Sequence, residues 1–123
     1  KRTILITIRN RTMVDVKRIQ EADYDLINIV GEVDASSSIE LDNAMSEAIS
    51  SGYKTFLVDC SALEYISSAG LGVFMSYIED FKKNDIRIAF FGLNEKVANV
   101  FEILGLDQLL TIKITKEEAR AAL

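Results

Sequence analysis

The sequence of 123 residues contains no histidine, no proline and a single cysteine, Cys60. Without histidine the chain lacks the base of serine and cysteine hydrolases, and the usual cysteine and histidine spacings of zinc sites are absent as well. A single cysteine cannot form an internal disulfide and is typical of a reducing compartment. We therefore expect no metal site, no cofactor and no enzymatic activity of the chain itself.

Long apolar runs and an excess of positive charge are also missing. No run approaches the roughly 20 residues of a membrane-spanning helix, and the first residues do not form the apolar core of a signal peptide. The 14 basic residues are outnumbered by 19 acidic ones, which gives a net charge of −5, and no continuous basic stripe interrupts this balance. Because a nucleic acid would need such a stripe, we expect no nucleic-acid partner. The missing apolar runs lead us to expect a cytoplasmic protein without a membrane span.

The residues that are present indicate one globular domain. Hydrophobic residues make up 49% of the chain and charged residues 27%. A chain of this length buries roughly 65 to 70% of the surface of its unfolded form. It therefore needs neither a metal nor a disulfide to hold its core.

The first part of the chain has the pattern of strands followed by a helix. Isoleucines alternate over residues 3–9, which predicts a half-buried strand or a strand-like arm. Residues 14–22 and 26–30 are apolar segments on either side of a turn, and together they predict a hairpin. The serines at 36–38 can start a helix with an apolar face, which Gly52 ends.

From residue 55 onward the pattern alternates between strands and helices. The continuous apolar run 55–59 is typical of a central strand that is covered on both faces. The remaining expected elements are a helix over 69–83, a strand over 86–91, a helix from its cap Asn94 to Gly105, a strand over 109–114, and a helix over 116–122 with a capping box at Thr115 and Glu118. The apolar positions of the helix over 69–83 are Leu71, Phe74, Met75, Ile78 and Phe81. This order predicts an α/β fold: a mixed sheet of four to five strands, with about four helices packed mainly on one face.

The segment 59–72 is the least generic part of the chain. Ser67 and Ser68 stand where a helix has unpaired N–H groups, and Gly70 and Gly72 follow although each glycine costs a helix about 1 kcal/mol. One interpretation is structural: a serine caps the helix and the glycines let it pack closely on the sheet. A nucleotide-binding loop does not fit, because no lysine follows the glycines and the third glycine is missing. The glycine-x-serine-x-glycine pattern of a hydrolase is absent too.

This segment resembles the corresponding part of STAS domains, which are named for sulphate transporters and anti-sigma factor antagonists. The similar residues are Ser-Ser-Ala-Gly-Leu-Gly at 67–72, Gly-Glu-Val-Asp at 31–34, and the late helix that ends in glycine, 97–105. The resemblance implies a STAS domain over residues 13–123. Residues 1–12 would then be an N-terminal extension, either an extra strand or a contact with a partner.

What the resemblance implies about function is partner switching. The unphosphorylated protein would bind an anti-sigma factor or a related serine kinase, phosphorylation at Ser68 would release it, and a phosphatase would reverse the modification. ATP and magnesium would belong to the partner kinase. Ser67 stands where the family has an aspartate, so Ser67 is the second choice for the phosphorylated residue. This departure also leaves open an alternative, a structural STAS module of a transporter-associated or stress-signalling complex that is not phosphorylated.

The implied partner surface combines the serine turn with the loop after residue 33. Its expected members are Asp34, Ser36, Ser67, Ala69, Gly70, Leu71 and Gly72. Two roles are open for Asp34. Its strand end is expected beside that of Asp59, from where it would orient the Ser68 hydroxyl, or it forms an Asx turn or helix cap with the serines that follow. Tyr65 either flanks this surface or belongs to the core.

Overall fold

A computed structural model describes residues 3–9 and 14–123 of the chain. Within these residues seven strands and four α-helices follow one another, with a short 3-10 helix between the last two strands. In chain order they are β1 (Ile4–Arg9), β2 (Val14–Gln20), β3 (Asp25–Val33), α1 (Ser38–Ser50), β4 (Thr55–Asp59), β5 (Leu63–Ile66), α2 (Ser68–Lys83), β6 (Arg87–Phe91), α3 (Glu95–Ile103), η1 (Leu106–Gln108), β7 (Thr111–Lys113) and α4 (Lys116–Ala121).

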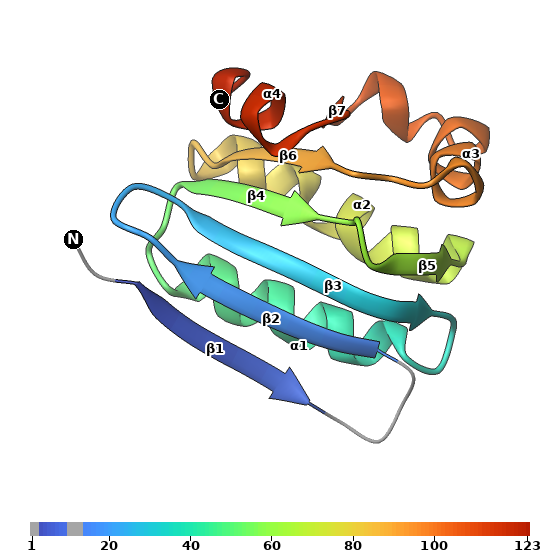
Figure 1. Ribbon diagram of the computed structural model, residues 1–123, viewed down its shortest axis with the longest axis horizontal. Coiled ribbons are helices and arrows are strands. Elements are labelled where there is room, and N and C mark those ends of the chain that lie inside the picture. Colours follow the sequence, from blue (N-terminus) through green and yellow to red (C-terminus); the bar gives the residue numbers. More distant parts are fainter. Residues whose placement is uncertain (1–2, 10–13) are drawn as a thin grey trace.

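The strands form one mixed sheet in the order β1-β2-β3-β4-β6-β7 (Figure 1). The first three strands are antiparallel neighbours, whereas β3, β4, β6 and β7 run parallel. The predicted hairpin is present as β2 and β3, and β4 has a parallel neighbour on each side, as expected for a central strand.

The predicted mixed sheet is confirmed, but it contains seven strands where four to five were expected. One additional strand is β5, whose four residues lie within the segment 59–72, where the sequence predicts no strand. It pairs with the distal half of β3, beyond the last residue that β3 shares with β4. The isoleucine-rich segment at the start of the chain also joins the sheet, because β1 pairs along its whole length with β2.

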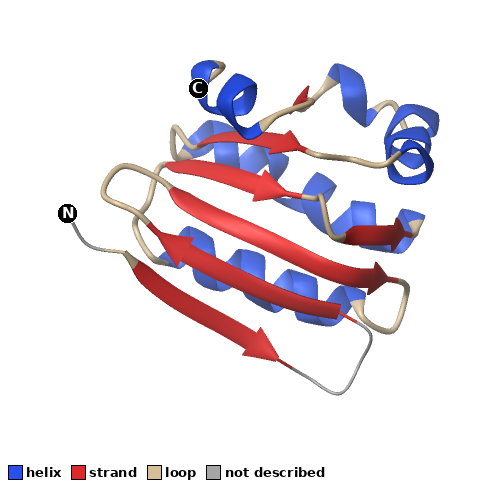
Figure 2. Cartoon of the chain, in the orientation of Figure 1, coloured by secondary structure: helices blue, strands red, loops and turns tan. Residues whose placement is uncertain are grey.

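The helices lie mainly on one face of the sheet, as Figure 2 shows. The larger core forms between this face and α1, α2 and α3, with Met45, Phe74, Phe90 and Phe101 at its centre. On the opposite face α4 covers a smaller cluster that consists of Tyr24, Leu26, Leu57, Ala89, Phe91 and Ala119. Among the described residues no helix combines the length and the apolarity that a membrane span requires.

Local capping residues set several helix boundaries where the sequence predicts them. The Asn94 side chain accepts a hydrogen bond from the Val97 N–H at 2.8 Å, and Thr115 and Glu118 form the predicted capping box. Gly52 and Gly105 follow α1 and α3 with φ values of 91° and 74°. Since this left-handed region favours glycine, both residues end their helices as expected.

An ion pair between Arg18 and Asp25 lies inside the fold, and the sequence interpretation did not anticipate it. The guanidinium donates two hydrogen bonds, of 2.5 and 3.1 Å, to Asp25 Oδ2. Both residues are at most 1% exposed, and Asp25 Oδ1 has no hydrogen-bond partner in the described part of the chain. Burial raises the pKa of Asp25, while the contact with Arg18 acts in the opposite direction.

Candidate functional site

The residues predicted to matter for function lie at the carboxyl ends of the parallel strands. In α/β sheets this edge is the usual place for binding sites. Here β5 brings two loops together, because Val33 is paired with Ile66 and the Ser67 N–H donates to the Val33 carbonyl at 2.8 Å. The loop that begins at Asp34 therefore lies beside the turn that begins at Ser67, and α1 and α2 both start at this edge (Figure 1).

The expected neighbour of Asp34 was wrong. Asp59 is paired with Asn28, six residues before Asp34 along β3, so the end of β4 does not reach the end of β3. The strand β5 occupies the place next to the distal half of β3 instead. The turn after Asp59 closes on itself, because Asp59 Oδ1 accepts hydrogen bonds from the backbone N–H and the hydroxyl of Ser61 at 2.9 and 2.6 Å.

Asp34 forms the Asx turn that was one of its two predicted roles. Its Oδ1 accepts hydrogen bonds from the backbone N–H groups of Ser36 and Ser37 at 2.9 and 3.0 Å, and from both hydroxyls at 2.8 and 3.1 Å. These bonds, led by the one from the Ser37 backbone, lower the pKa of Asp34. The structure shows no hydrogen bond between Asp34 and Ser68. The fold therefore does not support the other predicted role, in which Asp34 orients the Ser68 hydroxyl.

The two serines at the start of α2 have different environments. Ser67 is the N-cap, and its half-buried hydroxyl oxygen accepts a hydrogen bond from the Gly70 N–H at 3.1 Å. Ser68 is the first residue of the helix, and its side chain is exposed without a hydrogen bond to another described residue. The capping role thus belongs to Ser67, and the accessible hydroxyl belongs to Ser68.

The two glycines of this turn also differ from each other. A Cβ atom on Gly70 would lie 2.7 Å from Val33 Cγ1 and 2.8 Å from Ile66 Cγ1, whereas a Cβ on Gly72 would meet no atom within 4 Å. Close packing of α2 on β3 and β5 therefore explains Gly70. It does not explain Gly72, which is half-buried.

The members of the predicted partner surface differ in their exposure. Gly70 and Leu71 are buried, with Leu71 at 0% exposure, because they face the sheet rather than solvent. Ser36 and Ala69 are exposed, and Asp34, Ser67 and Gly72 are half-buried. A partner that binds this edge can therefore reach every predicted residue except Gly70 and Leu71.

Two apolar residues are exposed at the same segments. Met75 is 44% exposed, because it lies seven residues after Ser68 and shares the outer face of α2 with it. Tyr65 is 38% exposed on β5, so its second interpretation as a flanking residue fits the structure. Ile39, in the first turn of α1, is 63% exposed at the same edge, and the sequence analysis did not predict it as part of the surface. A helical wheel drawn from Ser68 would have placed Met75 outside.

The described residues carry little catalytic chemistry at this edge. The only thiol, Cys60, is 1% exposed, and burial raises its pKa above the usual value. Within residues 3–9 and 14–123 no three histidine, cysteine or acidic side chains gather in a way that could hold a metal ion. What the site offers is an exposed hydroxyl at a helix start, framed by two loops.

Comparison with known proteins defines the class of protein to which this fold and site belong. The family model of the STAS domain matches residues 14–119, and the chain belongs to this family.

Several similar proteins are named anti-sigma factor antagonists. An anti-sigma-B factor antagonist of Listeria monocytogenes is 29% identical over 102 residues, which cover 81% of this chain and 90% of the relative. The crystal structure of an anti-sigma factor antagonist from Mycobacterium paratuberculosis has the same fold, with a TM-score of 0.81 and 18% identity over 89% of this chain and 92% of that one. The phosphorylated form of the Bacillus cell fate determinant SpoIIAA superimposes with a TM-score of 0.60 and 19% identity over 97% of this chain and 98% of that one.

Proposed function

We propose that this protein is an anti-sigma factor antagonist that acts by partner switching. In its unmodified form it binds an anti-sigma factor that is also a serine kinase, and phosphorylation of Ser68 by that kinase releases it. The observation that carries the proposal is the free, exposed hydroxyl of Ser68 at the first residue of α2, in a chain whose relatives are anti-sigma-B factor antagonists. A kinase needs access to the hydroxyl that it modifies, and Ser68 offers it.

Ser68 is a better acceptor than Ser67 for a structural reason. The Ser67 hydroxyl caps α2 through the Gly70 N–H, and loss of such a cap costs about 1 kcal/mol. Modification of Ser67 would therefore disturb the helix, whereas modification of Ser68 leaves the cap in place.

The start of α2 can carry a phosphate without loss of the fold. The helix has 16 residues and no acidic residue in its first turn. A phosphate adds about −1.5 to −2 charges, which the unpaired N–H groups and the dipole at a helix N-terminus stabilise. The effect of the modification then falls on the interface with the partner.

The loss of affinity on phosphorylation is expected to be large. A contact that is closed around a neutral hydroxyl would have to desolvate a group with almost two charges, at a cost of several kcal/mol. Since about 1.4 kcal/mol corresponds to a factor of ten, the affinity should fall roughly 100-fold or more. The exposed residues Ser36, Ala69 and Met75 would contribute to the same contact.

The experiment combines site mapping with a binding assay. The protein is isolated from its own cells for intact-mass analysis and phosphosite mapping, and the anti-sigma factor that it retains is quantified for the wild type and for Ser68→Asp. We expect phosphate on Ser68 and loss of the partner from Ser68→Asp. Aspartate is favourable in the first turn of a helix, so the fold should be retained.

A matched control places the same charge at the other end of the neighbouring helix. Ser50→Asp changes an exposed serine at the last residue of α1, away from the Ser68 turn, and should retain the partner. Phosphate on Ser67 would show that Ser67, and not Ser68, is the phosphorylated residue. No phosphate under any growth condition, together with full binding by Ser68→Asp, would contradict partner switching and favour a structural STAS module.

A further inference from the structure

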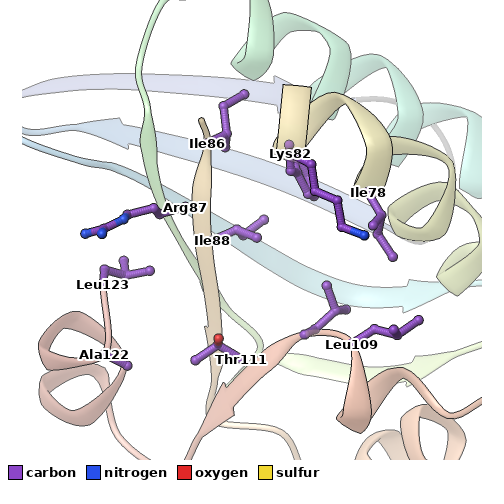
Figure 3. Close-up of a pocket in the computed structure, with 11 residues that line it drawn as sticks. Ile78, Lys82, Ile86, Arg87, Ile88, Leu109, Thr111, Ala122 and Leu123 are labelled. Atoms are coloured by element: carbon purple, nitrogen blue, oxygen red, sulfur yellow. The ribbon is translucent and has the colours of Figure 1, made fainter. Parts of the chain in front are cut away.

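A groove lies at the end of α2 that is remote from Ser68, between this helix, the start of β6, the segment after η1 and the end of α4. Its volume is 310 Å³, and Figure 3 shows the side chains that line it. Ser68 and Lys82 are 14 residues apart on α2, which places the groove about 21 Å along the helix axis from the candidate switch residue. The groove is therefore a surface separate from the proposed phosphorylation site.

The floor of the groove is apolar. It includes Ile86 and Ile88, which are 8% and 9% exposed, and Leu109, which is 62% exposed. Figure 3 shows Ile88 on β6 with Leu109 across the groove from it. Covering a large aliphatic side chain as exposed as Leu109 would remove apolar surface from water, which stabilises a complex.

Two cations stand at the rim on different elements. Lys82 comes from α2 and Arg87 from β6, and Figure 3 shows their charged ends on opposite sides of Ile88. Both residues are exposed, and neither has an ion-pair partner among the residues that the structure describes. The lining contains no acidic side chain, although acidic residues outnumber basic ones in the chain as a whole.

This arrangement of charge restricts what can occupy the groove. A second copy that presented its own groove would bring like charges together, which disfavours a symmetric dimer through this surface. A neutral apolar ligand would leave both cations unused. A ligand with a single anionic group would pair with only one of the two cations. The other cation, on the opposite side of the floor, would stay unpaired.

We propose that this groove binds an acidic amphipathic helix of a protein partner, with the apolar stripe of that helix on Ile88 and Leu109 and its carboxylates on either side at Lys82 and Arg87. Recognition of a helix through an apolar groove is a recurrent mode, in which residues at i, i+3, i+4 and i+7 are the anchors. Acidic residues on both flanks of that stripe match two cations on both flanks of the floor. The site is independent of the Ser68 turn, so a partner can bind here in either phosphorylation state.

The test uses the whole chain and a synthetic peptide of about four helical turns, with leucines at i, i+3, i+4 and i+7 and glutamates on both flanks. Binding is followed by NMR chemical shifts and by calorimetric titration. We expect saturable shifts at Ile88 and Leu109, and a loss of affinity of at least about ten-fold in the double variant K82E/R87E. The matched control K83E changes a neighbouring exposed lysine that does not line the groove, and should alter the affinity less than about two-fold.

Further arms of the experiment distinguish the other occupants. A peptide with lysine in place of every glutamate should not bind. Equal binding by K82E/R87E, shifts outside the groove, or a tighter response to decanoate than to the acidic peptide would overturn the proposal. A concentration-dependent dimer of the protein that the double variant K82E/R87E abolishes would also overturn the proposal. Ser68→Asp should leave peptide binding unchanged, so failure here and failure of the switch are separate results.

Discussion

The contrast between Gly70 and Gly72 gives a prediction about stability, in which alanine at Gly72 is the control for alanine at Gly70. Both residues lie in the first turns of α2, and neither has a positive φ, so alanine is compatible with the backbone at both positions. Alanine in place of a helical glycine contributes about 0.5 to 1 kcal/mol. We therefore expect Gly72→Ala, whose Cβ would meet nothing within 4 Å, to stabilise the protein by this amount.

Gly70→Ala should have the opposite effect. Its Cβ would approach Val33 Cγ1 to 2.7 Å and Ile66 Cγ1 to 2.8 Å, both on fully buried side chains. Overpacking of this kind costs about 1 to 3 kcal/mol, which exceeds the gain in helix propensity. Because that gain is common to both variants, the difference between their free energies of unfolding isolates the steric cost, about 1 to 3 kcal/mol.

Urea unfolding followed by circular dichroism measures the difference, with the slope of the transition compared between variants to confirm that the unfolded states match. If Gly70→Ala is as stable as Gly72→Ala, the approach of α2 to β3 and β5 is not what requires glycine. The explanation given for the residue would then be wrong.

Three further predictions concern other parts of the fold. Asp25→Ala should lower the free energy of unfolding in urea by about 3 to 5 kcal/mol, because it leaves the Arg18 guanidinium buried without a counter-charge. The double variant R18M/D25L should recover most of this loss. A cost below about 1 kcal/mol for Asp25→Ala would contradict this account of the ion pair. Cys60 should react with a thiol reagent only at the rate of unfolding, and a fast reaction of the native protein would show that the thiol is accessible. Burial and the hydrogen bond to Asp42 raise the pKa of Tyr77 to about 12, so ultraviolet titration should show a late step that Tyr77→Phe removes. Since the folded pKa lies above the unfolded value of 10.0, this contribution to stability is complete below pH 10 and is lost as the pH rises through 12; unchanged stability over that range would refute it.

The parts of the fold that the sequence predicts are those with local signals. Asn94 and Thr115 cap helices through bonds to residues three positions later, and such contacts can be read from the sequence alone. The continuous apolar run of β4 is equally local, because a strand covered on both faces has no polar positions to alternate with.

Features that depend on distant residues were missed. The strand β5 has only four residues, and it forms because β3 extends beyond β4 and offers it a partner. The neighbour of Asp34 follows from that pairing, so it was predicted wrongly as well. Strict alternation along β2 places Arg18 on the buried face with Val14 and Val16. A charged residue is nevertheless expected at the surface, and only its ion pair with Asp25 explains why Arg18 is buried.

At the site, residue types were predicted better than their exposure. The difference between Ser67 as cap and Ser68 as free hydroxyl depends on where the helix begins, which sequence patterns define only to within a residue or two. The burial of Leu71 and the exposure of Met75 follow from the rotation of α2 on the sheet. The close approach of Gly70 to Val33 and Ile66 accompanies this rotation, and it depends on residues that are distant in the sequence.

The position of Gly70 has a consequence for how information could leave this molecule. Two residues after Ser68 the helix backbone rests against Val33 and Ile66, with no room even for a methyl group. If Ser68 is phosphorylated as we propose, this contact leaves α2 little freedom to move in response. On that proposal, a partner that distinguishes the two forms would read charge rather than conformation, and the switch could turn as fast as the enzymes that add and remove the phosphate.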